Sequence, residues 1–208
     1  RDHLEAENAY TKAMMASTEA LQETLYREMR GRIKEDDSSV PAPDGPWEYY
    51  RRFETGAQHP KYVRRPRGAE APEEVLIDVD MQAKGKAFYK VISAQHAPDH
   101  SAFAYAVDEH GSEIYTVHVK DLASGATLAD PITNCTGDFC WSPCARFLFW
   151  TFRDDHGRPS KIYRRAARGG EDTLVYDEPD EGFFLGVGVS ESRAFILIHA
   201  GNGSQSEY

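Results

Sequence analysis

Two four-residue segments combine the side chains that bind metals or transfer protons. Asp108-Glu109-His110-Gly111 and Asp154-Asp155-His156-Gly157 each set two carboxylates beside an imidazole. These groups serve as metal ligands and as general acids or bases. Asp and Gly also favour the backbone conformations of tight turns. The surrounding elements must decide between a chemical and a structural role.

Two other segments contain residue types used in catalysis or cofactor binding. Asp99-His100-Ser101 has the composition of a serine-hydrolase triad, but triad side chains converge from separated positions. The stretch 186–191 (GVGVSE) resembles a dinucleotide-binding loop, yet no helix is indicated after it. No Gly-x-Ser-x-Gly elbow is present. We therefore assign no catalytic, cofactor-binding or metal-binding residue, and we expect no cofactor.

Charged clusters give no specific site either. The stretch 176–182 (YDEPDEG) carries four carboxylates without the ligand spacing of a calcium loop, which favours an acidic turn. Arginines 51, 52, 64 and 65 form a basic island. Contact with another part of the protein, or solvation of a strand face, is favoured there over a phosphate or nucleic-acid site.

The cysteines and the composition limit the class of protein. Cys135, Cys140 and Cys144 lack the C-x2-C spacing of zinc ribbons and favour small apolar side chains in or near strands. An odd cysteine count favours a reducing compartment. The net charge of −10 argues against nucleic-acid binding. No apolar run approaches the roughly 18 residues of a membrane span.

The first third of the chain predicts a helix and a linker. Between Leu4 and Lys34 an apolar stripe recurs at helical spacing, and Gly31 is placed to weaken or end the helix. Packing of this stripe on the chain itself is favoured over docking on a partner helix. We predict an N-terminal helical segment over 1–34 and a polar linker over 35–46. The stripe consists of Met14, Leu21, Leu25, Met29 and Ile33.

The remainder, 47–208, reads as short strands. The runs 47–53 and 61–66 predict a hairpin, and 75–80 predicts a short strand or the start of a turn. Further runs rich in β-branched and aromatic residues lie between glycine, proline or acidic turns. They are 103–107, 113–119, 126–130, 139–141, 147–152, 161–165, 173–178, 183–189 and 194–200.

These strands repeat. Phe103 matches Leu148 at a step of 45, His110 matches His156 at 46, and Ser142 matches Ser190 at 48. A period of this length with about four strands per repeat is typical of β-propeller blades. The two acidic-histidine tetrads fall at the same phase of consecutive repeats, which predicts hairpin turns.

Blade arithmetic predicts a partial propeller. About 160 residues follow the helix, enough for about three blades, whereas closure needs about four to eight. The last copy, 194–208, stops near its expected turn. We therefore expect the chain to be mainly β, a propeller segment of a larger protein preceded by an α-helix.

The order of these motifs resembles the prolyl oligopeptidase family, particularly its oligopeptidase B branch. The helix, the 35–41 link (EDDSSVP) and the 49–52 stretch (YYRR) resemble the entry region of the family. The stretch 97–125 resembles its second-blade pattern, S-P-D followed by A-Y-x-x-D-x-x-G-x-E-x-Y and D-L-x-x-G. The resemblance covers essentially the whole chain. Cys144 departs from the acidic residue common at its position.

The resemblance implies a serine oligopeptidase that cleaves short peptides after Arg or Lys. It implies a seven-bladed propeller over a C-terminal α/β-hydrolase domain that carries the Ser-Asp-His triad and lies outside this chain. No triad residue is therefore transferred to this sequence. The propeller would filter substrates by size, and the segment alone would not be catalytic. Acidic turns such as 176–182 could attract basic peptides.

The implied partners are short basic peptides and the protein's own hydrolase domain, without nucleic acid or membrane. The implied location is the cytoplasm, with the periplasm as the alternative. A non-catalytic β-propeller interaction module is the alternative function, and the gene beyond Tyr208 would separate the two.

Overall fold

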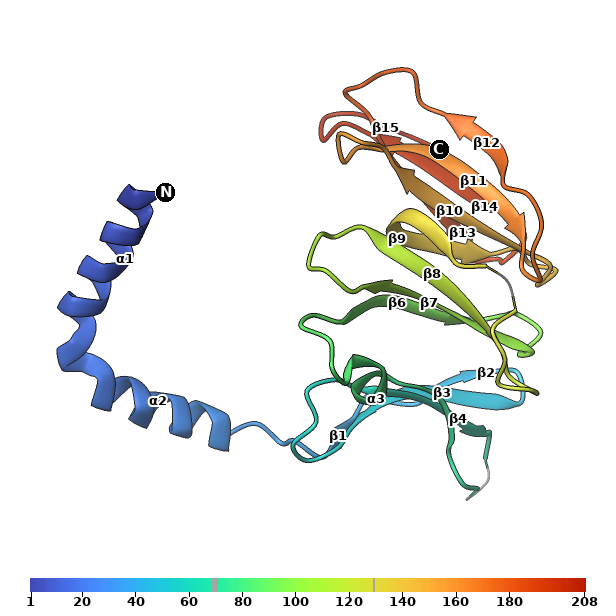
Figure 1. Ribbon diagram of the computed structural model, residues 1–208. Helices are drawn as coiled ribbons and strands as arrows, with labels where there is room; N and C mark the ends of the chain where they lie inside the picture. The colour runs from blue at the N-terminus through green and yellow to red at the C-terminus, as the bar shows by residue number, and fades with distance from the viewer. Residues whose placement is uncertain (69–70, 129) are drawn as a thin grey trace. The chain divides into compact units, whose positions relative to one another are not determined.

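The chain forms two compact units, Arg1–Glu73 and Glu74–Tyr208. The computed structural model describes residues 1–68, 71–128 and 130–208. The first unit holds two helices and a small sheet, and the second holds most of the strands (Figure 1). The fold is mainly β with helices at the N-terminus, as predicted.

The N-terminal helical segment is bent. Helix α1 (Asp2–Met15) and helix α2 (Glu19–Gly31) are separated by a 3₁₀ turn, η1 (Ala16–Thr18), and Figure 1 shows the change of direction. The Thr18 hydroxyl donates to the Met15 carbonyl oxygen at 2.7 Å. Such side-chain bonds to the preceding turn often bend helices. The prediction of one continuous helix was therefore wrong at this point, while Gly31 does end the second helix.

The apolar stripe of the helices is not covered. Neither helix has a buried residue, and Leu25, Met29 and Ile33 are 46%, 59% and 62% exposed. The prediction that this stripe packs on the chain itself is therefore wrong among the described residues. Exposed ion pairs four residues apart, such as Arg27 with Glu23 at 2.6 Å, add only a little to helix stability.

The sheet of the first unit is built on the predicted hairpin. Strands β3 (Trp47–Phe53) and β4 (Lys61–Pro66) pair in antiparallel register. The short strands β1 (Asp37–Ser38) and β2 (Ala42–Asp44) pair with the other edge of β3. The alternation of side chains sends Tyr50 and Val63 inward.

The second unit begins with a strand and a short helix and continues as hairpins. From residue 139 onward, each predicted strand run overlaps a strand of the structure. The elements are β5 (Glu74–Asp78), α3 (Val79–Ala83), β6 (Lys90–His96), β7 (Ala102–Asp108), β8 (Tyr115–Asp121), β9 (Ile132–Trp141), β10 (Phe147–Arg153), β11 (Pro159–Ala166), β12 (Thr173–Asp177), β13 (Phe184–Val189), β14 (Ile196–Gly201) and β15 (Ser206–Glu207).

One predicted strand is reduced to a single bridge. Within the described part of the run 126–130, Thr127 forms an isolated bridge with Lys120 of β8. Ala129 of this run lies outside the described residues. The sequence signal also missed β6, in which lysine, serine, glutamine and histidine interrupt the apolar pattern.

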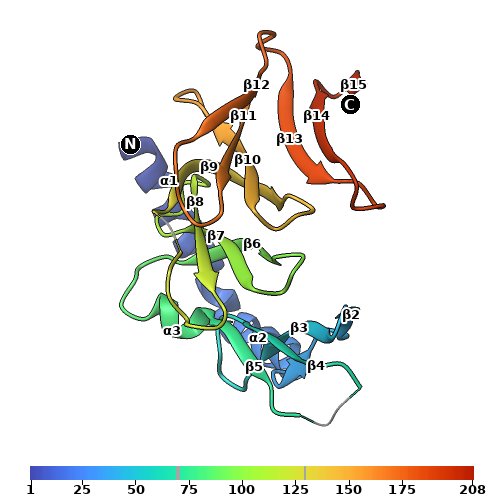
Figure 2. The ribbon, with the colours of Figure 1, turned by 90° about the vertical axis from the view of Figure 1, so that its right-hand side faces the viewer.

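Strand β9 belongs to two successive blades. Its first part pairs with β8 through Ile132 and Cys135, and its second part pairs with β10 through Phe139–Trp141. Cys135 pairs with both neighbours. The result is a seven-stranded sheet from β6 to β12, which is two blades joined by a common strand (Figure 2). Strands β13, β14 and β15 form the next sheet.

Apolar side chains pack between the blades. One buried cluster contains Val117, Val119, Trp141, Leu148 and Trp150, which lie on strands of the first two blades. A second cluster joins the second blade to the sheet of β13, β14 and β15. It contains Cys140, Ile162, Leu185, Val187 and Ala200. Cys140 and Trp141, successive residues of β9, thus face opposite sides, as the two-residue period of a strand requires.

The first two blades meet closely at Gly137. Its φ is +94°, and an added Cβ would lie 2.6 Å from the Ile92 Cγ2 atom. The Ser93 hydroxyl donates to the Gly137 carbonyl oxygen at 2.5 Å, and the Gln95 amide donates to the Phe139 carbonyl oxygen at 2.9 Å. Glycine is required here because both the backbone conformation and the space exclude a side chain.

Candidate functional site: a pocket among the blade loops

The acidic residue that opens each tetrad holds a hairpin turn together. Asp108 is 1% exposed, and its carboxylate accepts the backbone N–H groups of His110, Gly111 and Glu113 at 2.8–2.9 Å. Burial opposes ionisation of Asp108, but the backbone N–H groups around it outweigh this effect and lower its pKa. Asp154 accepts the N–H groups of His156 and Arg158.

The next blade makes the same turn without a carboxylate. Asn202 accepts the N–H groups of Ser204 and Gln205 through its amide oxygen at 3.0 and 2.8 Å. Asn202 follows Asp154 by 48 residues, which is the repeat period. An acceptor oxygen is therefore what this position supplies, and the turn needs no acid–base chemistry.

The other members of the tetrads do not converge. Glu109 pairs with Lys86 at 2.5 Å, while His110 and His156 are exposed. Within the residues that the structure describes, no group of three His, Cys, Asp or Glu side chains is arranged to hold a metal ion. The tetrads are turn-forming segments in this structure.

The loops at the opposite ends of the strands also repeat. His100, Ala145 and Arg193 all have a positive φ, of 61°, 59° and 56°. They lie 45 and 48 residues apart, at equivalent places between the first and second strand of each blade. Non-glycine residues rarely take this conformation, so its recurrence marks the same loop three times.

The Asp-His-Ser segment lies in the first of these loops and is not a triad. The Ser101 hydroxyl donates directly to Asp99 Oδ1 at 2.7 Å, without an imidazole between them. His100 instead stacks on His96, with ring centroids 5.3 Å apart. The expectation of a loop before a strand is confirmed.

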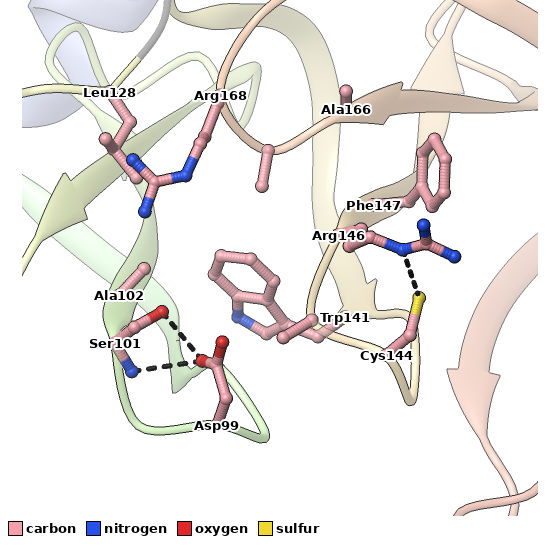
Figure 3. A pocket seen from close by; sticks show the side chains of 12 residues that line it. Asp99, Ser101, Ala102, Leu128, Trp141, Cys144, Arg146, Phe147, Ala166 and Arg168 are labelled. Carbon is pink, nitrogen blue, oxygen red and sulfur yellow. Dashed lines mark hydrogen bonds between the residues drawn. The ribbon is translucent and has the colours of Figure 1, made fainter.

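A pocket of about 340 Å³ lies among the loops of the first two blades (Figure 3). This volume falls within the roughly 300–1,000 Å³ of small-molecule pockets. Three segments far apart in sequence line it, all belonging to the second unit. They are Asp99, Ser101 and Ala102 at the start of β7, residues 144–147 leading into β10, and residues 166–168 at the end of β11, joined by Leu128 and Trp141.

The floor of the pocket is apolar and fixed. Trp141 is 4% exposed, and its indole N–H donates to the Gln95 carbonyl oxygen at 3.3 Å. Ala102 and Ala167 are buried beside it, and Leu128 packs against the same core cluster. The indole ring therefore presents a rigid apolar surface to the cavity.

The rim carries charge. Arg146 is exposed, and its Nε donates to the Cys144 Sγ atom at 3.5 Å. Hydrogen bonds from Arg146 and then from Ser142 lower the pKa of the Cys144 thiol to about 7. Arg168 makes a long ion pair of 3.7 Å with Asp121. Asp99 supplies a carboxylate on the other side.

The three cysteines thus differ. Cys135 and Cys140 are buried in β9 as small apolar side chains, in agreement with the sequence prediction. Burial raises the pKa of each of these two thiols to about 12. Cys144 is exposed in a loop, where the preceding repeat has Asp99. Because the pKa of the Cys144 thiol is about 7, its ionised form partly replaces the negative charge of a carboxylate at this place.

The acidic stretch 176–182 is a folded turn rather than an open cluster. Glu178 accepts the Tyr176 hydroxyl and the Asp180 N–H, both at 3.0 Å. Arg158 donates to the carbonyl oxygens of Glu178 and Asp180 at 2.7 Å. Asp177 pairs with Lys161 at 3.1 Å. Among these four carboxylates, Glu181 makes no hydrogen bond or ion pair within the part of the chain that the structure describes.

The remaining sequence candidates are also structural. Residues 186–189 of the glycine-rich stretch form part of β13 and pair with β14. In the basic island, Arg52 pairs with Glu54 and Glu73, and Arg65 pairs with Glu48, each at 2.8 Å. Arg64 stacks over Trp47 at 3.9 Å. These guanidinium groups serve the first unit itself.

Comparison with known proteins identifies the family. The family model for the prolyl oligopeptidase N-terminal beta-propeller domain matches residues 1–208. The chain belongs to the prolyl oligopeptidase family. It is 37% identical to dipeptidyl aminopeptidase BI of Pseudoxanthomonas mexicana and 30% identical to Protease 2 of Moraxella lacunata. Each match covers 99% of this chain and 31% of the relative.

Solved structures agree with this membership of the prolyl oligopeptidase family. Oligopeptidase B from Leishmania major superimposes with a TM-score of 0.85 at 31% identity, over 96% of this chain and 29% of that one. Oligopeptidase B from Trypanosoma brucei gives the same TM-score at 29% identity, with the same shares of each chain covered. The chain therefore spans about a third of the length of these relatives. The partial propeller and the resemblance to the family are confirmed.

The pocket is the feature that sequence reasoning missed. Its two arginines, Arg146 and Arg168, lie in different loops and match no motif, and Asp99 was considered only as part of the Asp-His-Ser segment. The available signal was the repeat itself, because residues at the same phase of neighbouring blades occupy neighbouring loops.

Among the described residues no helix combines the length and the apolar composition of a membrane span.

Proposed function

We propose that this chain is the N-terminal propeller part of a serine oligopeptidase that hydrolyses short peptides after Arg or Lys. The observation that carries the proposal is the superposition on two oligopeptidase B structures at a TM-score of 0.85. Identity of 30% and 37% to two peptidases over nearly the whole chain supports a peptidase. The Ser-Asp-His triad belongs, in this proposal, to a C-terminal hydrolase domain.

The role of the propeller is to select substrates by size. Blades joined by a common strand and closely packed side chains form a rigid wall, as at Gly137 and Ser93. A rigid ring over a catalytic domain admits flexible short peptides and excludes folded proteins. This segment contributes the wall and not the bond-breaking groups.

A second peptidase specificity has its own support. The relative with 37% identity is named a dipeptidyl aminopeptidase, so release of dipeptides from a free N-terminus is the alternative to internal cleavage after a basic residue. A non-catalytic propeller module is the third candidate. The cytoplasm is the proposed compartment, with the periplasm as the alternative.

The test uses the full-length protein and chromogenic substrates. We expect turnover of an N-blocked Arg-ended substrate, and its loss after treatment with a serine-directed inhibitor. A matched unblocked dipeptide substrate separates the two specificities, because dipeptide release requires a free amino group. Turnover of the unblocked substrate alone would favour the dipeptidyl activity.

The size filter has a separate readout. We expect a short Arg-containing peptide to be cleaved and the same sequence placed inside a folded protein to resist cleavage. The denatured form of that protein serves as the control for accessibility. Absence of all peptidase activity in a correctly folded full-length protein would contradict the enzyme proposal and favour the interaction module.

A further inference from the structure

The pocket around Trp141 combines three features that suit one kind of ligand. Its floor is the buried indole with Ala102 and Ala167. Figure 3 shows Arg168 and Arg146 on either side of that indole, with Asp99 beside it. An apolar surface between cationic groups favours an apolar body that carries a carboxylate.

The two guanidinium groups keep donors available. A guanidinium has five N–H donors. Arg146 uses its Nε on Cys144, and Arg168 contacts Asp121 at a distance of 3.7 Å. Each can therefore bind a carboxylate with its remaining N–H groups, in the two-point geometry that arginine favours.

Asp99 adds a second polar requirement. Its Oδ1 atom accepts the N–H and the hydroxyl of Ser101 at 3.0 and 2.7 Å. The other carboxylate oxygen remains an acceptor for a ligand N–H. A ligand with a carboxylate, an N–H group and an apolar side chain satisfies the whole lining.

We propose that this pocket binds the C-terminal residue of a short peptide, with an apolar side chain on the Trp141 indole, its carboxylate at Arg168 and its amide N–H at Asp99. The inference rests on the proposed function, which makes short peptides the molecules that the protein meets. It adds a binding place on the propeller itself, lined by residues of the first two blades.

The experiment uses the full-length protein after treatment with an irreversible serine-directed inhibitor, so that probes are not consumed. The probe is N-acetyl-Ala-Phe with a free carboxylate, and its C-terminal amide is the control ligand. Because Cys144 lies on the pocket rim, its rate of alkylation by iodoacetamide reports occupancy of this pocket. Calorimetry gives the affinity.

We expect the free acid to slow alkylation of Cys144 and the amide to bind about tenfold more weakly, since a hydrogen bond between two charged groups is stronger than one to a neutral amide. Arg168→Gln should weaken the acid to the level of the amide. Arg51→Gln, an exposed arginine of the first unit, is the matched control and should change nothing. Equal binding of acid and amide, or no effect of Arg168→Gln, would overturn the proposal.

A third ligand and a separate assay sharpen the outcome. 3-Phenylpropionate lacks the amide N–H, and binding as tight as that of the peptide would assign the pocket to free apolar carboxylates instead. Peptide hydrolysis measured on untreated protein separates the two proposals. Hydrolysis without probe binding contradicts the pocket alone, whereas probe binding without hydrolysis contradicts the peptidase alone.

Discussion

At the residue scale, the same side-chain types do different work according to the backbone groups around them. Asp108 is a buried acceptor for three N–H groups, whereas its neighbour Glu109 is an exposed partner of Lys86. The acidic-histidine pattern therefore records turn geometry. The equivalent positions of the two tetrads in consecutive repeats predict this turn-forming role from the sequence.

Substitution at the first tetrad should separate these roles. Asp108→Ala is expected to lower the free energy of unfolding by about 2–3 kcal/mol, because three backbone N–H groups of the turn lose their buried acceptor. Asp108→Asn should cost about 1 kcal/mol, since an amide oxygen performs this task at Asn202. Urea unfolding of the full-length protein measures both. Glu109→Ala is the control, with about 0.5 kcal/mol or less; an equal loss there would contradict the turn role.

The cysteines offer a test of local electrostatics. We expect iodoacetamide to modify Cys144 alone, at a rate that rises as pH increases through about 7. Cys135 and Cys140, with pKa values raised to about 12, serve as internal controls and should stay unmodified in the folded protein. Mass spectrometry of tryptic peptides gives the rates. Arg146→Gln should move the midpoint towards 9, the ordinary value for a thiol.

The lowered pKa also links Cys144 to stability, with a definite sign. Ionised Cys144 is favoured in the folded state, so its contribution is present above the unfolded value of 9 and is lost as pH falls through about 7. Cys144→Ser should flatten the stability of the protein over this interval. An unchanged pH profile of thermal unfolding in that variant would contradict the interaction with Arg146.

At the element scale, strands were predictable because alternation and β-branched residues mark them directly. The 3₁₀ turn at Ala16–Thr18 was not, because the residues around it fit a helical pattern and its distinctive contact is one hydrogen bond from the Thr18 hydroxyl. Strand β6 was missed because Ser93 and Gln95 make polar contacts to the next blade. The pocket was missed because its lining comes from three loops that are far apart in the sequence and become neighbours only when the blades pack.

The contact between blades at Gly137 provides the element-scale test. Gly137→Ala should lower the free energy of unfolding by about 2–4 kcal/mol, because the new methyl group meets Ile92 and the backbone conformation is strained. Gly157→Ala has a similar φ of +81° with open space, so about 1 kcal/mol is expected. Thermal unfolding compares the pair. Equal losses would show that backbone strain alone matters.

At the scale of the whole molecule, the net charge of the chain bears on the proposal that its substrates are basic peptides. The net charge of −10 should attract cationic peptides over distances that salt screens. We expect kcat/KM of the full-length protein for an Arg-containing peptide to fall as ionic strength rises. A neutral peptide of equal length is the control and should change little. The same slope for both peptides would contradict steering by charge.

Within the acidic turn, the proposed attraction of basic peptides can be separated from the structural role of the carboxylates. Glu181→Gln should reduce the salt dependence slightly and leave stability unchanged. Glu178→Gln should instead destabilise the fold, because Glu178 is 8% exposed and accepts two hydrogen bonds. Measuring kcat/KM against salt and thermal unfolding for both variants separates steering from folding.

Strand β9 has one further consequence. Because one continuous strand closes the first blade and opens the second, neither blade can lose it without leaving the other incomplete. Both blades should therefore unfold together when the chain is pulled from its ends. Pulling on single molecules should release residues 90–177 in one step, where independent blades would give two.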